Sequence, residues 1–288
     1  MTGSEFTGAV VQLCAGRNVD RNIADACDLI REAAGRGADL IVTPEQTALM
    51  ELETRALFAN LAEEGQDRAL AQFQSLAGAL QRWLIIGSLA VRVGPQCAAN
   101  RSFVIAPDGT ICARYDKIHM FDVDLPGGET YRESKNYRPG EAAVVADLPW
   151  GRVGLSICYD LRFAALYRRL AQSGATMLTV PAAFTKVTGA AHWHVLLRAR
   201  AIETGSYVLA AAQGGTHENG RQTFGHSLII DPWGRILAEA DTGPGVMLAK
   251  IDPEQAAQAR RRIPALDHDR QFASPEPAPA ETTQELDQ

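Results

Sequence analysis

Short apolar runs and longer amphipathic stretches follow one another along most of the chain. The short runs are rich in aliphatic residues and predict buried strands at 9–13, 40–42, 83–89, 153–157, 177–180, 207–212 and 246–251. The longer stretches carry apolar residues at helical spacing and predict helices at 22–34, 52–63, 67–81, 160–170, 192–204 and 253–262. This order of strands and helices predicts an α/β fold with a mixed sheet.

Two pieces of the pattern occur twice. The segment 37–44, Gly-Ala-Asp-Leu-Ile-Val-Thr-Pro, resembles 174–181, Gly-Ala-Thr-Met-Leu-Thr-Val-Pro, and each follows a predicted helix. The hairpin turns at 105–111 and 230–236 are also alike, with Pro-Asp-Gly in one and Asp-Pro-Trp-Gly in the other. Two similar halves, each a sheet covered by helices, would stack into a four-layer α-β-β-α sandwich, which is the architecture we expect.

The composition is that of a globular protein, because 46% of the 288 residues are hydrophobic and 22% are charged. A chain of this length can bury a large core. We place a single domain at 8–272, after a short N-terminal extension at 1–7. Residues 273–288 are rich in Pro, Ala and Glu, which predicts a disordered tail.

Charge and apolar content argue against several classes of partner. The formal net charge of −6 disfavours electrostatic binding of nucleic acid. No apolar run approaches the roughly 18 residues of a membrane span, and the first residues lack the basic and apolar regions of a signal peptide. The five cysteines are an odd number without a Cys-x-x-Cys pair, so neither a disulfide framework nor a zinc ribbon is indicated. We expect a cytoplasmic protein that binds neither nucleic acid nor a membrane.

The stretch from Gly151 to Phe163 combines a buried strand with the start of a helix, and Cys158 lies at their junction. Asp160 is placed to cap the first turn of that helix. Nearby backbone N–H groups and the positive end of a helix dipole would favour a thiolate at Cys158. A single cysteine is more often a buried core residue, so the sequence must supply partners before a reaction can be assigned.

A nucleophilic cysteine needs a base, and Glu45 is one candidate. It directly follows a buried strand and a proline, at the end of the sheet where the active sites of open α/β folds gather. Its counterpart in the second half is Ala182, so only one half carries the acid. A helix cap or a solvated acid would explain Glu45 equally well. A histidine could also be the base, and the chain has six: His119, His192, His194, His217, His226 and His268.

Two further charged residues belong to a long irregular region at 117–141, and loops of this length are usually functional. Lys117 is at its start and Glu133 is within it. Spacing alone does not place either residue in a site. A metal site made by His192 and His194 is disfavoured, because residues two apart on a helix point in different directions.

The segments around these residues contain an ordered set of motifs. They are Thr43-Pro-Glu45, Tyr115-Asp-Lys117-Ile-His-Met-Phe-Asp, Ser156-Ile-Cys158-Tyr-Asp-Leu-Arg-Phe, Pro181-Ala-Ala-Phe, Ala191-His-Trp, Leu197-Arg-Ala-Arg-Ala-Ile-Glu-Thr, Gly225-His-Ser and Asp231-Pro-Trp-Gly. In this order the set resembles the nitrilase superfamily of carbon–nitrogen hydrolases, and the resemblance covers residues 8–262. It implies a nitrilase-like fold for almost the whole chain outside the tail.

The resemblance also implies a Glu-Lys-Cys site. Cys158 would be the nucleophile, Glu45 the general base and Lys117 the cation beside the oxyanion. Glu133 matches a second glutamate that the superfamily places next to the lysine. Such a site attacks an amide carbonyl, releases ammonia and hydrolyses the resulting thioester, with the Tyr159 N–H as a further oxyanion donor. No cofactor and no metal ion are required.

Within the superfamily the chain resembles the amidase branch. Some members of this branch act on deaminated glutathione and others on α-keto acid amides, and the chain resembles those that act on deaminated glutathione more closely. These substrates carry carboxylates, so Arg162 is a candidate for binding them, although it could equally pair with Asp160. Tyr159 and His194 are the other candidate substrate-binding residues. His194 stands where many relatives have Glu, and Ala164 stands where many have Pro.

Other functions remain open. A nitrilase would convert nitriles, and an N-carbamoyl amidohydrolase would release carbon dioxide together with ammonia. A binding scaffold without activity could share the fold, but it would have no need for Glu45, Lys117 and Cys158 together. The expected partners are a small amide substrate and, from the resemblance, at least one further copy of the chain in a homodimer or larger homo-oligomer.

Overall fold

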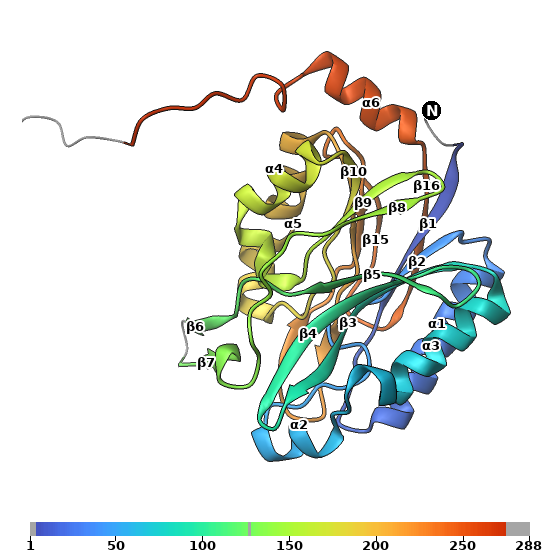
Figure 1. Cartoon of the computed structure of the whole chain (residues 1–288), viewed down its shortest axis with the longest axis vertical. Helices are drawn as coiled ribbons and strands as arrows, with labels where there is room; N and C mark the ends of the chain where they lie inside the picture. Colours follow the sequence, from blue (N-terminus) through green and yellow to red (C-terminus); the bar gives the residue numbers. More distant parts are fainter. Residues whose placement is uncertain (1–3, 126–127, 275–288) are drawn as a thin grey trace, which may run out of the picture.

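Two six-stranded sheets lie face to face in the computed structural model, which describes residues 4–125 and 128–274 (Figure 1). The first sheet has the strand order β16 (Gly245–Ile251), β1 (Phe6–Gln12), β2 (Leu40–Val42), β3 (Trp83–Gly94), β4 (Cys97–Ile105) and β5 (Ile111–Asp116). The second has the order β8 (Val145–Leu148), β9 (Gly151–Leu155), β10 (Ala175–Thr179), β11 (Tyr207–Ala210), β14 (Leu228–Ile230) and β15 (Ile236–Glu239). Both contain parallel and antiparallel neighbours, so the predicted mixed sheets are confirmed.

The two sheets repeat one topology, as the repeated sequence pattern predicts. In each sheet an antiparallel edge strand is followed by three parallel strands and then by two antiparallel ones. Strands β1, β2 and β3 therefore correspond to β9, β10 and β11. The two hairpin turns are equivalent as well, because Gly109 and Gly234 have φ angles of +85° and +81°, which glycine adopts without strain.

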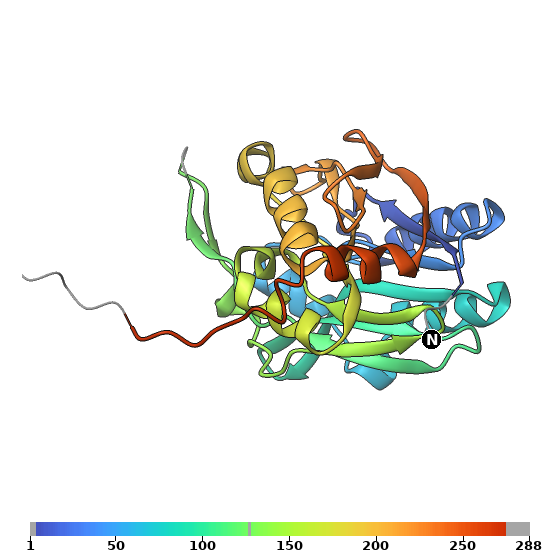
Figure 2. The same ribbon diagram turned by 90° about the horizontal axis from the view of Figure 1, so that it is seen from above.

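Helices cover the outer face of each sheet and complete four layers (Figures 1 and 2). Helices α1 (Val19–Gly35) and α3 (Arg68–Leu80) pack on the first sheet, and α4 (Ala164–Gln172) and α5 (Lys186–Thr204) pack on the second. Strand β1 shows the alternation that permits this packing. Ala9 and Val11 join the helix-facing core, whereas Val10 joins the core between the sheets. The expected α-β-β-α sandwich is confirmed.

The remaining elements lie at the ends and edges of the sandwich. They are the helices α2 (Thr54–Asn60) and α6 (Pro253–Arg262), the 3₁₀ turns η1 (Glu64–Gln66), η2 (Glu133–Lys135) and η3 (Cys158–Arg162), and the hairpins β6 (Asp122–Asp124) with β7 (Thr130–Arg132) and β12 (Gly214–Thr216) with β13 (Gln222–Phe224). The β6–β7 hairpin projects from the body, and α6 lies across one end (Figures 1 and 2). Residues 275–288 of the predicted tail lie outside the described residues. Strand β1 begins at Phe6, within the predicted N-terminal extension.

Helix α5 is longer than the stretch 192–204 that apolar spacing predicts. It begins at Lys186, because the side chain of Thr185 accepts a hydrogen bond from the backbone of the first turn. Gly189 lies inside this first part and would ordinarily weaken a helix. A Cβ atom at that position would collide with the ring of Phe224. The glycine therefore permits close packing against β13 and does not end the helix.

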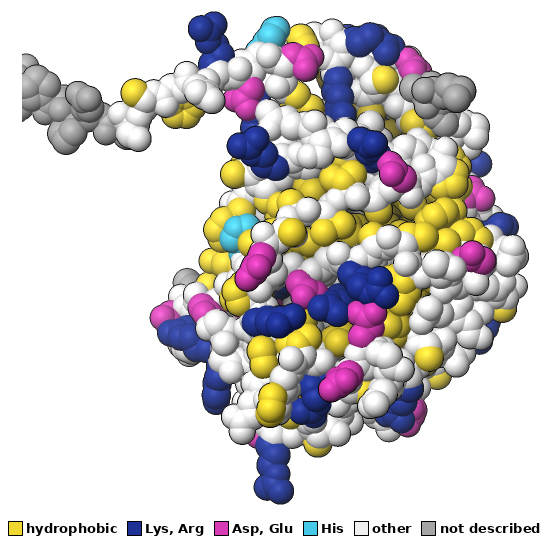
Figure 3. Space-filling view, viewed as in Figure 1, with side chains coloured by type: hydrophobic (Ala, Val, Ile, Leu, Met, Phe, Trp, Pro, Cys, Tyr) yellow, Lys and Arg dark blue, Asp and Glu magenta, His cyan; other side chains and the backbone are white. Residues whose placement is uncertain are grey.

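The surface carries charges of both signs. Figure 3 shows Lys, Arg, Asp and Glu side chains interspersed over one face, with hydrophobic side chains between them. That face does not present the single-sign basic stripe that nucleic-acid binding requires. None of the helices in the described part of the chain combines the length and the apolar character that crossing a bilayer requires.

Candidate active site

Four segments that are distant in the sequence meet in one cavity of about 200 Å³. Glu45 follows β2 of the first sheet, and Cys158 follows β9 of the second sheet. Lys117 comes directly after β5, and Glu133 begins the turn η2. All four line the cavity. The structure therefore brings together the residues that the sequence predicts as catalytic.

Lys117 is a buried cation held between two carboxylates. Its Nζ atom donates to Oε1 of Glu45 at 2.9 Å and to both carboxylate oxygens of Glu133, at 2.8 and 3.0 Å. The side chain is only 1% exposed. Burial alone would lower the pKa of Lys117, but the charges of Glu133 and Glu45 raise the pKa well above its ordinary value. The ammonium is therefore charged at neutral pH.

Glu45 is held in place through both of its carboxylate oxygens. Besides Lys117, Oε1 accepts a hydrogen bond from Nδ2 of Asn100 at 2.9 Å, and Oε2 accepts one from the backbone N–H of Ala183 at 2.9 Å. Burial would raise the pKa of Glu45, but Lys117 and a hydrogen bond with Cys158 keep that pKa below its ordinary value. Glu45 is therefore an anion that can accept a proton.

Cys158 occupies a sharp turn in the backbone. Its φ angle is +51°, a left-handed conformation that costs a residue other than glycine about 1–3 kcal/mol. Its backbone N–H donates to the carbonyl oxygen of Pro181 at 2.8 Å, which ties the turn to the loop after β10. This geometry fixes the position of the sulfur at the end of the strand.

The Cys158 sulfur is a thiol at rest, which corrects the local expectation of a thiolate. Burial and the negative charge of Glu45 raise the pKa of Cys158 well above its ordinary value. Lys117 acts in the opposite direction but does not outweigh them. The segment that follows is also the short 3₁₀ turn η3, and the regular helix α4 begins only at Ala164. The dipole of a long helix therefore does not start at the sulfur.

Asn100 is a site residue that the sequence analysis missed. Its Nδ2 atom donates to Glu45 at 2.9 Å and to Oε1 of Glu133 at 3.0 Å, so that it bridges the two carboxylates. Its backbone carbonyl accepts the N–H of Lys117 at 2.9 Å. In β4 it stands next to two further polar residues, Arg101 and Ser102, so no signal in the sequence singles out Asn100.

Several buried polar atoms around the cavity lack a hydrogen-bond partner among the described residues. They include Oη of Tyr137, Oδ1 of Asn136, Nε of Arg221 and Oδ1 of Asn100. The first three of these residues line the cavity that holds Cys158. Because buried polar groups are usually paired, this concentration indicates donors and acceptors that a bound substrate can satisfy.

Arg221 places a positive charge in the cavity wall. One guanidinium nitrogen donates to the carbonyl oxygen of Ala183 at 2.6 Å, and the group lies 5.2 Å from the centre of the Tyr131 ring. Within the described residues it forms no salt bridge with a carboxylate. Nothing in the spacing of the sequence predicts this position, because Arg221 comes from the loop between β12 and β13.

The three predicted substrate-binding residues are not among those that line the cavity. The guanidinium of Arg162 lies near Nδ1 of His192, at 3.3 Å, and over the ring of Tyr159, at 5.8 Å from its centre. It does not pair with Asp160, whose carboxylate is bonded elsewhere. His194 instead contacts a carboxylate on β15. Substrate contacts by these residues stay predictions.

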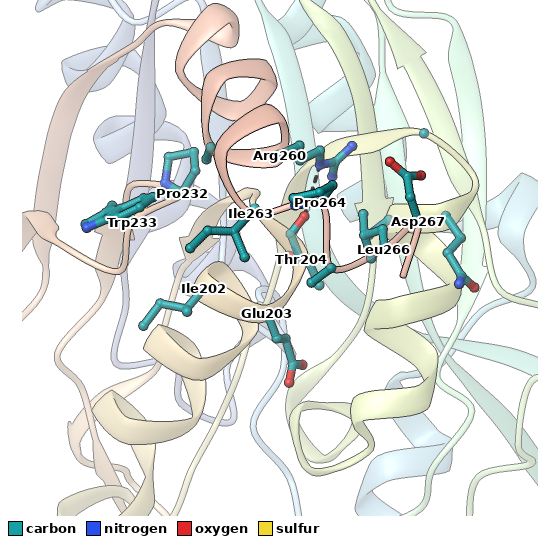
Figure 4. Close-up of a pocket in the computed structure, with 16 residues that line it drawn as sticks. Ile202, Glu203, Thr204, Pro232, Trp233, Arg260, Ile263, Pro264, Leu266 and Asp267 are labelled. Carbon is teal, nitrogen blue, oxygen red and sulfur yellow. Dashed lines mark hydrogen bonds between the residues drawn. The ribbon is translucent and has the colours of Figure 1, made fainter. Parts of the chain in front are cut away.

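A second cavity, of about 510 Å³, lies beside α6. Figure 4 shows Ile202, Trp233, Arg260 and Ile263 around it. None of the four predicted catalytic residues lines this cavity. We therefore assign no chemistry to it.

Known proteins that are similar in sequence belong to the family that this arrangement of residues indicates. Residues 8–261 match the family model described as carbon-nitrogen hydrolase. The chain is 41% identical over 270 residues to a protein of Yersinia enterocolitica named deaminated glutathione amidase, covering 92% of this chain and 93% of that protein. It is 36% identical over 261 residues to the omega-amidase NIT2 of Homo sapiens, covering 91% of this chain and 94% of that protein.

Solved structures are similar as well. The NitFhit protein of C. elegans has a TM-score of 0.86 at 33% identity, covering 94% of this chain and 66% of that chain. An amidase of Nesterenkonia sp. AN1 has a TM-score of 0.77 at 25% identity, covering 90% and 95%. In that structure, of a glutamate-to-glutamine mutant, the acetamide moiety of fluoroacetamide is attached to the active-site cysteine. This chain belongs to the carbon–nitrogen hydrolase family.

Proposed function

We propose that this protein hydrolyses the C–N bond of a small amide that carries a carboxylate, through a thioester on Cys158, and releases ammonia. The observation that carries the proposal is the convergence of Glu45, Lys117, Glu133 and Cys158 in one cavity. Relatives at about 40% identity are named deaminated glutathione amidase, which makes deaminated glutathione the first substrate to test.

The first step is attack by the Cys158 sulfur on the amide carbonyl carbon. The raised pKa of the thiol and the lowered pKa of Glu45 mean that a thiolate does not accumulate before substrate binds. The thiol proton therefore moves to Glu45 as the S–C bond forms. This coupling makes the carboxylate indispensable, because the thiol alone is a poor nucleophile.

The tetrahedral intermediate carries its negative charge beside Lys117. When Glu45 accepts the thiol proton it loses its charge, and its attraction for the Lys117 ammonium weakens. Glu133 keeps the ammonium in place through two contacts of 2.8 and 3.0 Å. The field of Lys117 then acts on the new oxyanion, and donors of this kind are each worth about 10²–10³-fold in rate.

The intermediate collapses when Glu45 returns its proton to the amide nitrogen, so that ammonia leaves and the acyl group stays on sulfur. Glu45, again a carboxylate, removes a proton from a water molecule that attacks the thioester. The second intermediate expels the Cys158 sulfur, which regains the proton. Each step uses only groups that line the cavity, together with water.

The substrate carboxylate is proposed to bind Arg221. Its guanidinium has no carboxylate partner among the described residues, and its buried Nε atom lacks a hydrogen bond. A planar guanidinium matches a carboxylate in two parallel hydrogen bonds. Tyr137 and Asn136 supply a hydroxyl and an amide in the same wall. Arg162, the residue expected from the sequence, is the alternative.

The experiment is a panel that measures ammonia release from deaminated glutathione, α-ketoglutaramate, a carbamoyl amino acid, a simple nitrile and a neutral amide. We expect turnover of the carboxylate-bearing amides and little of the neutral amide. Preference for the nitrile or the carbamoyl compound would overturn the proposal. Preference for α-ketoglutaramate would favour the omega-amidase function, which the 36% identical human relative supports as second candidate.

The assembly and compartment are part of this proposal. We propose a cytoplasmic homodimer or larger homo-oligomer. Exposed apolar side chains favour contact between copies, since Val195 and Ile202 of α5 are 69% and 55% exposed and Trp233 is 58% exposed. Light scattering of the purified chain gives the mass of the particle, and a monomer would contradict this part of the proposal.

A further inference from the structure

We propose that His194, His226 and Glu239 form a binding site for one divalent transition-metal ion, of which Zn²⁺ is the representative. The three residues come from separate elements: His194 from α5, His226 from the turn before β14 and Glu239 from the end of β15. None of them lines the cavity that contains Cys158. The site is therefore distinct from the proposed catalytic machinery.

The donor atoms of the three residues lie close together around one point. Nε2 of His194 lies 2.8 Å and Nδ1 of His226 lies 3.1 Å from Oε1 of Glu239, and the donor atoms of the group lie within 4.8 Å of one another. Zinc bonds of about 2.0–2.2 Å in a tetrahedron place neighbouring ligand atoms about 3.3 Å apart. The two distances from Oε1 of Glu239 to the histidine nitrogens therefore need to lengthen by only a few tenths of an ångström to admit the ion.

The backbone holds the His226 ring at this point. Its φ angle is +52°, a left-handed conformation that residues other than glycine seldom adopt. The carbonyl oxygen of His226 accepts the indole N–H of Trp193 at 2.8 Å, which ties this turn to the residue next to His194. The His226 ring also packs on Phe224, with 4.4 Å between the centroids. Strained residues of this kind gather at ligand sites.

The chemistry of the donors selects the metal. Two imidazoles and one carboxylate suit Zn²⁺, Ni²⁺ and Cu²⁺ better than Mg²⁺ or Ca²⁺, which prefer oxygen ligands. The side chains of His194, His226 and Glu239 are 32%, 24% and 36% exposed, so an ion can reach them from solvent. Three protein ligands leave a position for water.

The site does not depend on the His192–His194 pair that helix geometry disfavours. His194 projects toward the β14–β15 region and finds its partners there. An ion at this point would link α5 to the second sheet. That link predicts a rise in the thermal stability of the protein when the ion binds.

The test titrates Zn²⁺ by calorimetry into the tag-free full-length protein after removal of metal with a chelator. We expect one equivalent to bind. The variants are His194→Gln, Glu239→Gln and His226→Asn, the last chosen because asparagine tolerates a positive φ. Each should lower the affinity by at least about tenfold. The exposed His268→Ala variant, which leaves the three donors in place, should bind as the wild type does.

Cobalt(II) reports the ligands of the wild-type protein directly. Nitrogen and oxygen ligands give visible d–d bands without the near-ultraviolet charge-transfer band of a thiolate. No binding to the wild type, a thiolate band, or unchanged affinity in folded variants would each overturn the proposal. Circular dichroism checks the fold of the variants, and the wild-type cobalt spectrum decides the question even where a variant does not fold.

Discussion

The Nζ atom of Lys117 lies 2.9 Å from Oε1 of Glu45, and this buried ion pair joins the carboxyl ends of β5 and β2. It keeps both groups charged in a place where an isolated charge would be strongly destabilising. Burial raises the pKa of the Cys158 thiol, and the charge of the same carboxylate raises it further. Glu45 therefore influences the protonation states of the proposed cation and nucleophile as well as being the proposed base.

The pH dependence distinguishes a carboxylate base from a histidine base. The pKa of Glu45 lies below its ordinary value of 4.5, and the pKa of Cys158 lies above its ordinary value of 9.0. We therefore expect kcat/KM to stay level between these two values and to fall only outside them. An inflection near neutral pH, as for a histidine, would contradict the role of Glu45.

The free energy of unfolding should depend on pH in the direction that the pKa shifts of Glu45 and Lys117 predict. Glu45 has a lowered pKa in the folded protein, so its contribution to stability is present above 4.5 and is lost as the pH falls through the folded value. Lys117 has a raised pKa, so its contribution is present below 10.5 and is lost as the pH rises through the folded value. Urea unfolding at several pH values should show a plateau between these limits. A maximum confined to acidic pH would be inconsistent with the ion pair.

Glu133→Gln tests the second carboxylate. The variant removes one counter-charge from the buried ammonium, and we expect the free energy of unfolding to fall by about 1–3 kcal/mol. We expect kcat to fall about 10²-fold, because Lys117 would be held less firmly beside the oxyanion. Glu141→Gln, at an exposed position, is the matched control and should change neither quantity. Equal effects of the two substitutions would exclude a special role for Glu133.

Asn100 is predicted to act as a positioning residue between the two carboxylates. Asn100→Ala removes both donated hydrogen bonds and should lower kcat. Asn100→Asp places a third carboxylate there, which should raise the pKa of Glu45. The acid limb of kcat/KM should then move to higher pH in Asn100→Asp only. A residue that only supports the fold would lower activity in both variants without moving that limb.

Arg221→Gln tests recognition of the substrate carboxylate. Loss of charge-assisted hydrogen bonds worth about 1.5–3 kcal/mol should raise KM for a carboxylate-bearing amide by roughly 10–100-fold. The neutral amide of similar size should be affected much less. Arg262→Gln, exposed at the end of α6, is the control. Equal losses on both substrates would mean that Arg221 does not bind the carboxylate, and Arg162→Gln would be the next variant in the same comparison.

The sequence predicts the elements where local pattern decides the structure. Strand β2 and helix α6 have the predicted limits, because compact apolar spacing at 40–42 and Pro253 at the helix start are local signals. The predicted helix at 192–204 is shorter than α5, because Gly189 argues against a helix when only the sequence is considered. The glycine is explained by its contact with the ring of Phe224, which lies far along the chain.

The site was less accessible to prediction than the fold. Resemblance to a family, and not spacing, assembles Glu45, Lys117 and Cys158. Asn100 and Arg221 escape prediction because their roles come from contacts across strands and loops. The thiolate expected at Cys158 is wrong because burial raises the pKa of the thiol, and so does the negative charge of Glu45, which comes from the other sheet.

The most direct test of the proposed mechanism is intact-protein mass spectrometry after rapid acid quench of the enzyme with its amide substrate. We predict a species heavier by the substrate minus ammonia, located on Cys158 by peptide mapping and absent from Cys158→Ala, which should keep its fold and release no ammonia. Acylation of Cys14, Cys27, Cys97 or Cys112 in its place, or ammonia release that persists in Cys158→Ala, would contradict a thioester on Cys158.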